Sequence, residues 1–344
     1  MPDSVSLKSP RERGLVILLC QDRELDKTFG SLNKNLLGPL NADLALFGTE
    51  SEASRGIDYA HKWSYPEPSD WTQEILNVGI SAEWLGRLAA LHPSFLGGIH
   101  LGTQTSHAGQ KTGSGAIILF WRYLLGKTLS ESRELDDYDW FVITRSDFTW
   151  ASPFPPIENF DPHKIYFLDG EKYGGVSDRF ILFHRNSLSS VVAICDELFE
   201  TPERVYERLR NLSSINPEVF LSVEWGNLGV MERACFLPYI AFSIRSASGT
   251  SRWQMGSWND KLGFFVKYRN EYRQAKSFAK FIRKPNHWGR FPQGFPSLRL
   301  LAATVLFRLE TAAESVGFVN QARKGLRRIH RLVVRPSATS GWKP

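Results

Sequence analysis

The stretch that decides the fold class is residues 14–48, GLVILLCQDRELDKTFGSLNKNLLGPLNADLALFG. It begins with six apolar residues, a pattern typical of a strand that is buried on both faces. Four apolar residues then recur at helical spacing: Leu25, Phe29, Leu32 and Leu36. Gly38 and Pro39 end that predicted helix, and residues 42–48 form a second short apolar run. A strand, a helix and a strand in this order predict an α/β protein with a parallel sheet.

The rest of the chain extends this pattern with further strands and helices. We expect strands at 139–144, 164–170, 178–185 and 236–245. We expect helices at about 70–78, 82–91, 114–126, 187–200, 202–212 and 217–228. From about residue 261 onward the sequence is basic and predicted to be helical.

Composition indicates an ordinary soluble globular protein. Of 344 residues, 42% are hydrophobic and 23% charged, and no stretch approaches the ~20 apolar residues of a membrane span. The apolar run near the N-terminus is also too short for the core of a signal peptide. Three widely spaced cysteines, Cys20, Cys195 and Cys235, favour neither a disulfide framework nor a zinc site. We therefore expect a cytoplasmic protein, with its thiols in a reducing compartment.

Charge is distributed very unevenly. Residues 261–344 hold 18 Lys and Arg against three acids, whereas the rest of the chain carries a net negative charge. Such a basic block suggests a polyanionic acceptor, nucleic acid or an anionic lipid surface as partner. Within it, residues 322–335 alternate bases with apolar residues at helical spacing. A helix of this kind, over about 317–335, can lie peripherally on an anionic membrane, or it can pack on the main domain.

The segment DDYDWFVITRSDFTW, residues 136–150, places charged side chains at the end of a buried strand. In open α/β sheets, ligands bind beyond the carboxyl ends of the parallel strands. Arg145 and Asp147 stand two residues apart, so an extended chain directs both to the same side. A carboxylate there can hold Mg²⁺ or Mn²⁺, and an arginine can bind a diphosphate. A surface salt bridge is the alternative interpretation.

Two glycine-containing loops are further candidates. In YGGVSDRF, residues 173–180, Gly174 and Gly175 permit a tight turn or close approach of a ligand, and Asp178 begins the next strand. Tyr173 can line a sugar site, although the segment also reads as an ordinary hairpin loop. A second loop, HAGQKTGSG at 107–115, precedes a predicted helix, whose N-terminus can attract phosphate. Its candidate donor-binding residues are Lys111, Gly113 and Gly115.

Several common site motifs are missing from the sequence. It has no GxSxG, HExxH, GxxxxGK[ST] or GxGxxG pattern. The stretches 252–258 and 286–291 combine aromatic residues with bases, which suits either nucleic-acid contact or an aromatic core. No RRM-, KH- or zinc-finger-like signature accompanies them, so a nucleic-acid partner is not favoured.

Three segments together resemble a family of glycosyltransferase-like proteins with the GT-A, nucleotide-diphospho-sugar transferase fold, which is associated with surface polysaccharide and lipopolysaccharide synthesis. They are GLVILLCQDRELDKTFGSLNKNLL, YDWFVITRSDFTW, and YGGVSDRFILF followed by INPEVFLSVEW at 215–225. The likeness covers roughly residues 14–246. The R-S-D at 145–147 stands where better-known members carry D-x-D and offers one carboxylate instead of two. The first loop also lacks the glycine that many relatives place before the arginine.

The resemblance implies roles for individual residues. Asp147 would coordinate Mn²⁺ or Mg²⁺ on the diphosphate of the donor, with Arg145 assisting and Arg23 near the nucleotide. The loop of Tyr173, Gly174 and Gly175 would border the acceptor. If transfer inverts the sugar, Asp178 is the first candidate for the base and Glu218 the second.

The function expected from this resemblance is metal-assisted transfer of a sugar from a nucleotide-diphospho-sugar to a hydroxyl of a glycan or lipid-linked acceptor. We expect a disordered segment at 1–13, a GT-A-like, mostly parallel α/β catalytic domain at 14–255 and a basic, mainly helical extension at 256–344. One alternative is a non-catalytic α/β protein that binds a polyanion or nucleic acid through the basic segment. Another is a transferase fold that serves only as a scaffold.

Overall fold

The computed structural model describes residues 12–92, 94–96, 115–246, 255–280 and 282. Its strands are β1 Gly14–Gln21, β2 Ala42–Thr49, β3 His61–Ser64, β4 Trp140–Thr144, β5 Phe148–Trp150, β6 Ile165–Asp169, β7 Phe180–His184, β8 Ala234–Pro238, β9 Ala241–Arg245, β10 Ser257–Asn259 and β11 Phe264–Val266. Its α-helices are α1 Leu25–Leu32, α2 Gly38–Leu40, α3 Trp71–Asn77, α4 Ala82–Leu91, α5 Gly115–Glu131, α6 Leu188–Val192, α7 Asp196–Glu200, α8 Pro202–Leu209, α9 Pro217–Asn227 and α10 Arg269–Ala279.

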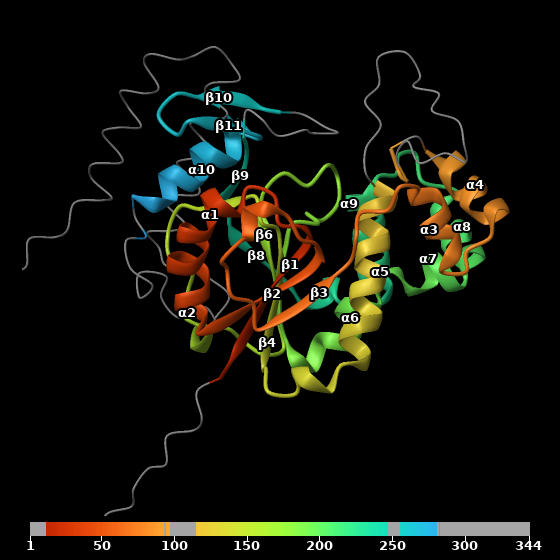
Figure 1. Ribbon diagram of the computed structural model, residues 1–344. Helices are drawn as coiled ribbons and strands as arrows, with labels where there is room; N and C mark the ends of the chain where they lie inside the picture. The colour runs from red at the N-terminus through yellow and green to blue at the C-terminus, as the bar shows by residue number, and fades with distance from the viewer. Residues whose placement is uncertain (1–11, 93, 97–114, 247–254, 281, 283–344) are drawn as a thin grey trace, which may run out of the picture.

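Seven strands form the central sheet, in the order β3-β2-β1-β4-β7-β6-β8. Strand β7 runs antiparallel to β4 and β6, and the other neighbouring pairs are parallel. Helices cover both faces of this sheet (Figure 1). The expected α/β fold with a mostly parallel sheet flanked by helices is thus confirmed, and it is consistent with a Rossmann-like GT-A fold.

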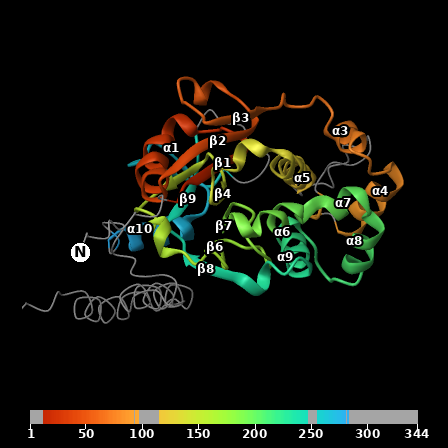
Figure 2. The same ribbon diagram turned by 90° about the horizontal axis from the view of Figure 1, so that it is seen from below.

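The apolar run of β1 explains why the sheet is buried on both faces. Leu15 and Ile17 belong to one hydrophobic cluster and Val16 and Leu18 to another, and all four are fully buried. Helices α5 and α9 contribute to the first cluster, while α1 and α10 contribute to the second. Figure 2 shows these two helix groups on opposite sides of the sheet. The core therefore fixes the strands and leaves their carboxyl ends for loops.

A second, smaller sheet lies beside the first, in the order β10-β11-β9-β5. The segment 236–245, expected to be one strand, is divided between the two sheets, because the chain leaves β8 at Pro238 and enters β9 at Ala241. Strands β10 and β11 pair onto β9, so the boundary expected at 255/256 falls inside this sheet. Residues 257–282 belong to the main domain instead of an extension. Strands β3 and β5 were not predicted either.

Several expectations fall partly or wholly outside the described residues. They concern the disordered N-terminal segment up to residue 11, the basic chain from residue 283 and its membrane-facing helix at 317–335. Arg13, at the end of the expected disordered segment, donates its backbone N–H to Asp139 at 3.0 Å and is ordered beside β4. Among the residues that the structure describes, no helix is both long and apolar enough to cross a membrane.

Candidate functional site

The candidate site lies where β1 and β4 end and β7 begins. Parallel pairing sets Leu18 of β1 beside Thr144 of β4, and antiparallel pairing sets Thr144 beside Phe180 of β7. The loop after β1, the segment after β4 and the segment before β7 consequently meet at one edge of the sheet. This register places the segments that carry Arg23, Arg145, Asp147 and Asp178 at the same edge of the sheet.

Asp147 is almost fully enclosed at this edge, with only 2% of its surface exposed. Arg145 donates to both of its carboxylate oxygens, from Nε to Oδ1 at 3.0 Å and from Nη2 to Oδ2 at 2.9 Å. Arg245, at the end of β9, donates to Oδ2 as well. Burial alone would raise the pKa of Asp147, but the two guanidinium groups lower it well below its usual range. Asp147 is therefore a carboxylate that is always charged and bound to two arginines.

These contacts bear on whether Asp147 can hold Mn²⁺ or Mg²⁺. Both ions prefer several oxygen ligands, and a guanidinium group that occupies a carboxylate oxygen also repels a metal ion there. Within the described parts of the chain, no group of three or more His, Cys, Asp or Glu residues gathers in a way that suits a metal. The residues present do not fit the expected metal ion. The interpretation of Asp147 as a metal ligand is corrected to that of an anion that orients arginines.

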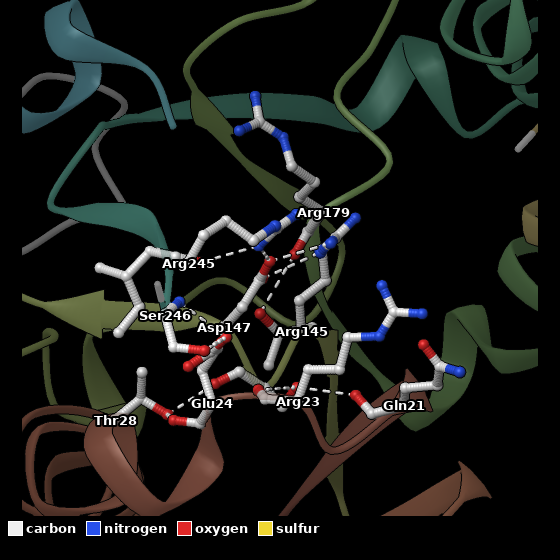
Figure 3. A network of polar contacts seen from close by, with 12 residues as sticks. Gln21, Arg23, Glu24, Thr28, Arg145, Asp147, Arg179, Arg245 and Ser246 are labelled. Carbon is white, nitrogen blue, oxygen red and sulfur yellow. Dashed lines mark hydrogen bonds and ion pairs between the residues drawn. The ribbon is translucent and has the colours of Figure 1, made fainter. Parts of the chain in front are cut away.

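Cations, not carboxylates, dominate this edge. We call Arg23, Arg145, Arg245 and Lys267 the cationic cluster; Figure 3 shows its three arginines around Asp147. Partial burial, followed by the charges of Arg245 and Arg145, lowers the pKa of Arg23. Burial, followed by the same two arginines, lowers the pKa of Lys267 to about 7. The depressed pKa of these two bases therefore reflects burial first and the repulsion of neighbouring positive charges second.

Short hydrogen bonds hold the backbone of the cluster in place. Ser146 donates its hydroxyl to the carbonyl oxygens of Gln21 at 2.7 Å and Arg23 at 2.8 Å. Glu24 accepts from the backbone and hydroxyl of Ser246, each at 2.8 Å, which ties the end of β9 to the start of α1. Figure 3 shows Glu24 beside Ser246. The loop after β1 is thereby fastened to the strand tips that carry Arg145 and Arg245.

Two carboxyl groups form the other half of the site. Asp178 precedes β7, and Glu218 lies in the first turn of α9. Burial, followed by the charge of Asp178, raises the pKa of Glu218 to about 7. Lys267 and Arg179 also act on Glu218, so the carboxyl pair and the cationic cluster belong to one electrostatic site. A carboxyl group that titrates near neutrality is suited to accept a proton.

Gly175 permits close packing of the 173–178 loop against α9. The N–H of Val176 donates to the Glu218 carbonyl oxygen at 3.1 Å, and a Cβ on Gly175 would lie only 2.0 Å from that oxygen. Asn216 caps α9 and donates its side-chain amide to the Tyr173 carbonyl oxygen at 2.8 Å. Tyr173 and Gly174 both have positive φ, of 46° and 88°. The close approach expected of this loop is thus an approach to the helix that carries Glu218.

A buried ion pair connects this edge to α10. Arg179 donates from Nη1 and Nη2 to the carboxylate of Glu271 at 3.0 and 2.7 Å, and both side chains are about 4% exposed. The Tyr268 ring covers the guanidinium, with its centroid 4.8 Å away. Sequence reasoning missed Arg179, Arg245, Lys267 and Glu271 as members of the site. Only Arg179 had a signal in the sequence, because it directly follows Asp178 in the tripeptide SDR at 177–179.

A cavity of about 670 Å³ opens beside the cationic cluster, and Lys267 is part of its wall. Its lining is mostly polar and comes from the end of β6, from β10 and from the start of α10. The residues are Asp169, Gly170, Glu171, Met255, Gly256, Ser257, Lys267, Tyr268, Arg269, Asn270, Glu271 and Gln274. The volume lies in the range of small-molecule sites.

The glycine loop before α5 contributes one described residue, Gly115. It is buried at the start of the helix, where a Cβ would lie 2.2 Å from the Phe95 carbonyl oxygen and 2.9 Å from Pro217. This glycine is explained by packing, and its expected role in donor binding is corrected accordingly. Lys111 and Gly113 lie outside the described residues.

Comparison with known proteins gives distant likenesses among solved structures. No protein-family model and no curated protein sequence matches the chain. Among solved structures, the chain is similar to mouse xyloside xylosyltransferase 1 in its apo form, at a TM-score of 0.34 and 10% identity. The likeness covers 66% of this chain and 85% of that one. At this level it supports no argument about chemistry, which must come from the residues of the site.

Proposed function

We propose that the protein is a glycosyltransferase that moves a sugar from a nucleotide-diphospho-sugar to a hydroxyl of a glycan or lipid-linked acceptor. One observation carries the proposal: a cationic cluster and a carboxyl pair share a single edge of the sheet. Sugar transfer from such a donor needs both, because negative charge develops on the departing diphosphate while the acceptor hydroxyl loses a proton. The α/β fold and its loop-bearing strand ends are compatible with this use.

In this proposal Glu218 is the general base of an inverting displacement. The ionised carboxylate takes the proton of the acceptor hydroxyl as that oxygen bonds to the anomeric carbon. The bond from that carbon to the diphosphate breaks, and the nucleoside diphosphate leaves with the electron pair. Burial and Asp178 raise the pKa of Glu218 to about 7, which makes it a stronger base than an ordinary carboxylate and reverses the preference for Asp178. No step is assigned to Mn²⁺ or Mg²⁺.

The polar cavity beside Lys267 is the proposed place for sugar rings. Its wall offers carboxylate, amide and hydroxyl groups, which hydrogen-bond sugar hydroxyls well, and the exposed Tyr173 ring lies near its Tyr268 edge. A lipid-linked acceptor would agree with the proposed peripheral contact of residues 317–335 with the cytoplasmic face of a membrane. The rival interpretation, polyanion binding without catalysis, predicts binding but no turnover.

The test is release of nucleoside diphosphate from a panel of UDP- and GDP-sugars by the full chain. We expect Glu218→Gln to lower the rate by about 100-fold or more, because general-base catalysis supplies about that much. Glu203→Gln is the matched control, since Glu203 also follows a proline in the first turn of a helix, α8, but is exposed and is not one of the site residues. Equal rates for all three proteins would refute Glu218 as the base, and no release from any donor would refute the function.

A further inference from the structure

We propose that the cationic cluster binds the diphosphate of the donor directly, in the position where a divalent metal ion was expected. The proposal depends on the function proposed above for the identity of the donor. Binding of the diphosphate itself is a separate property that can be measured without turnover. The ligand class is a pyrophosphate group, free or carried by a nucleotide.

The balance of charge at the site supports this inference. Four cationic side chains converge there, and two carboxylates act on Arg23, namely Asp147 and Glu67. Glu24 is already engaged by Lys27 and Ser246, and Glu271 by Arg179. The four bases nevertheless crowd one another, since the charges of Arg145 and Arg245 help to lower the pKa of both Arg23 and Lys267. A diphosphate would offset this mutual repulsion.

The geometry of the arginines supports it as well. Asp147 holds Arg145 through two parallel hydrogen bonds and holds Arg245 through a third, so both guanidinium groups are oriented before any ligand arrives. Pre-oriented guanidinium groups match the paired oxygens of phosphate. Arg245 is 5% exposed, and its Nε has no hydrogen-bond partner among the described residues. A buried donor without a partner is costly, and a phosphate oxygen is a suitable acceptor for it.

Lys267 connects the cluster to the space that a ligand needs. It belongs to the wall of the 670 Å³ cavity and acts electrostatically on Asp147, Arg145 and Arg245. A diphosphate held by the arginines would therefore place its attached groups toward this cavity and toward Glu218. Arginine and lysine clamps can stabilise a departing phosphate in the role that a metal ion plays elsewhere.

The experiment measures binding of inorganic pyrophosphate and of UDP and GDP to the full chain by calorimetry, in excess EDTA and then with Mn²⁺. We expect binding in EDTA, with a Kd within about threefold of the value with Mn²⁺. Lys267→Met and Arg23→Met should each weaken binding by about tenfold or more, since each removes a charge-assisted contact. The controls Lys261→Met, at the exposed β10–β11 turn, and Arg55→Met, in an exposed ion pair, should leave the Kd unchanged.

Asp147→Asn separates the two roles of this acid. If Asp147 orients arginines and binds no metal ion, Asp147→Asn should change the Kd in EDTA and the Kd with Mn²⁺ to the same extent, provided that the variant is folded. Lys267→Met provides the test if the Asp147→Asn protein does not fold. Binding that requires Mn²⁺, binding that is absent, or equal losses in the control variants would overturn the inference. Sugar transfer that requires Mn²⁺ would overturn it while leaving the function standing. Diphosphate binding without metal but also without any turnover would support the inference and contradict the proposed function.

Discussion

At the scale of single residues, the site depends on two groups whose pKa values are moved toward neutrality in opposite directions. The pKa of Glu218 is raised to about 7 and that of Lys267 is lowered to about 7. Burial is the largest cause for both, because a charged group loses the hydration that stabilises it. Asp147 behaves differently, since two arginines more than compensate for its burial. One edge of a sheet thus contains a base, a titratable cation and a permanent anion.

The raised pKa of Glu218 predicts how the rate depends on pH. A general base must be ionised, so kcat at saturating donor should fall by about tenfold for each pH unit below 7 and level off above it. The donor is kept saturating because Lys267 also has a pKa of about 7. A bound diphosphate would keep Lys267 charged, so that the profile reports on Glu218. Rates measured from pH 5.5 to 8.5 would check this, and a flat profile over that range would argue against Glu218 as the base.

The buried ion pair of Asp147 predicts a cost in stability. Asp147→Asn leaves the buried Arg245 without its counter-charge, so the free energy of unfolding should drop by roughly 3 kcal/mol or more. The control is Asp136→Asn, which breaks the pair of the largely exposed Asp136 with Arg185 and should cost less than about 1 kcal/mol. Urea unfolding of both variants measures the difference, and similar small costs would show that Asp147 is not held as described.

At the scale of elements, the packing of the 173–178 loop against α9 positions Glu218, the proposed base. Gly175→Ala would push a methyl group to within 2.0 Å of the Glu218 carbonyl oxygen, so we expect lower stability and a rate at least about tenfold lower. Gly226→Ala, in the same helix, meets no atom within 4 Å and should stabilise α9 by about 0.5–1 kcal/mol. Thermal unfolding and donor turnover compare the two variants. An unaffected Gly175→Ala protein would contradict the packing described.

The sequence was informative where chemistry and strand pattern coincide. Arg145 and Asp147 could be placed together because they stand two residues apart at the end of an uninterrupted apolar run. Arg245 could not, since 236–245 is predominantly apolar and its pattern predicts one strand, whereas the chain changes sheets after Pro238. Lys267 was hidden for another reason: it is one of many bases in a basic block, and only the pairing of β11 with β9 brings it to the site.

At the scale of the whole molecule, the site is assembled from segments that are far apart in the chain. The central sheet supplies Arg23, Arg145 and Arg179, the small sheet supplies Arg245 and Lys267, and α10 supplies Glu271. The buried Arg179–Glu271 pair joins α10 to the edge of the central sheet. This arrangement explains why residues beyond the expected boundary at 255 belong to the domain. Strands β9, β10 and β11 and helix α10 lie together beside the central sheet (Figure 1).

The most direct test of the account is a crystal structure of the full chain with a bound nucleoside diphosphate, grown in EDTA. We expect the diphosphate oxygens to lie about 3 Å from Arg145, Arg245 and Lys267, with the cavity and Glu218 on the side where a sugar would be attached. A diphosphate bound elsewhere, or one that orders only when Mn²⁺ bridges it to Asp147, would contradict the account.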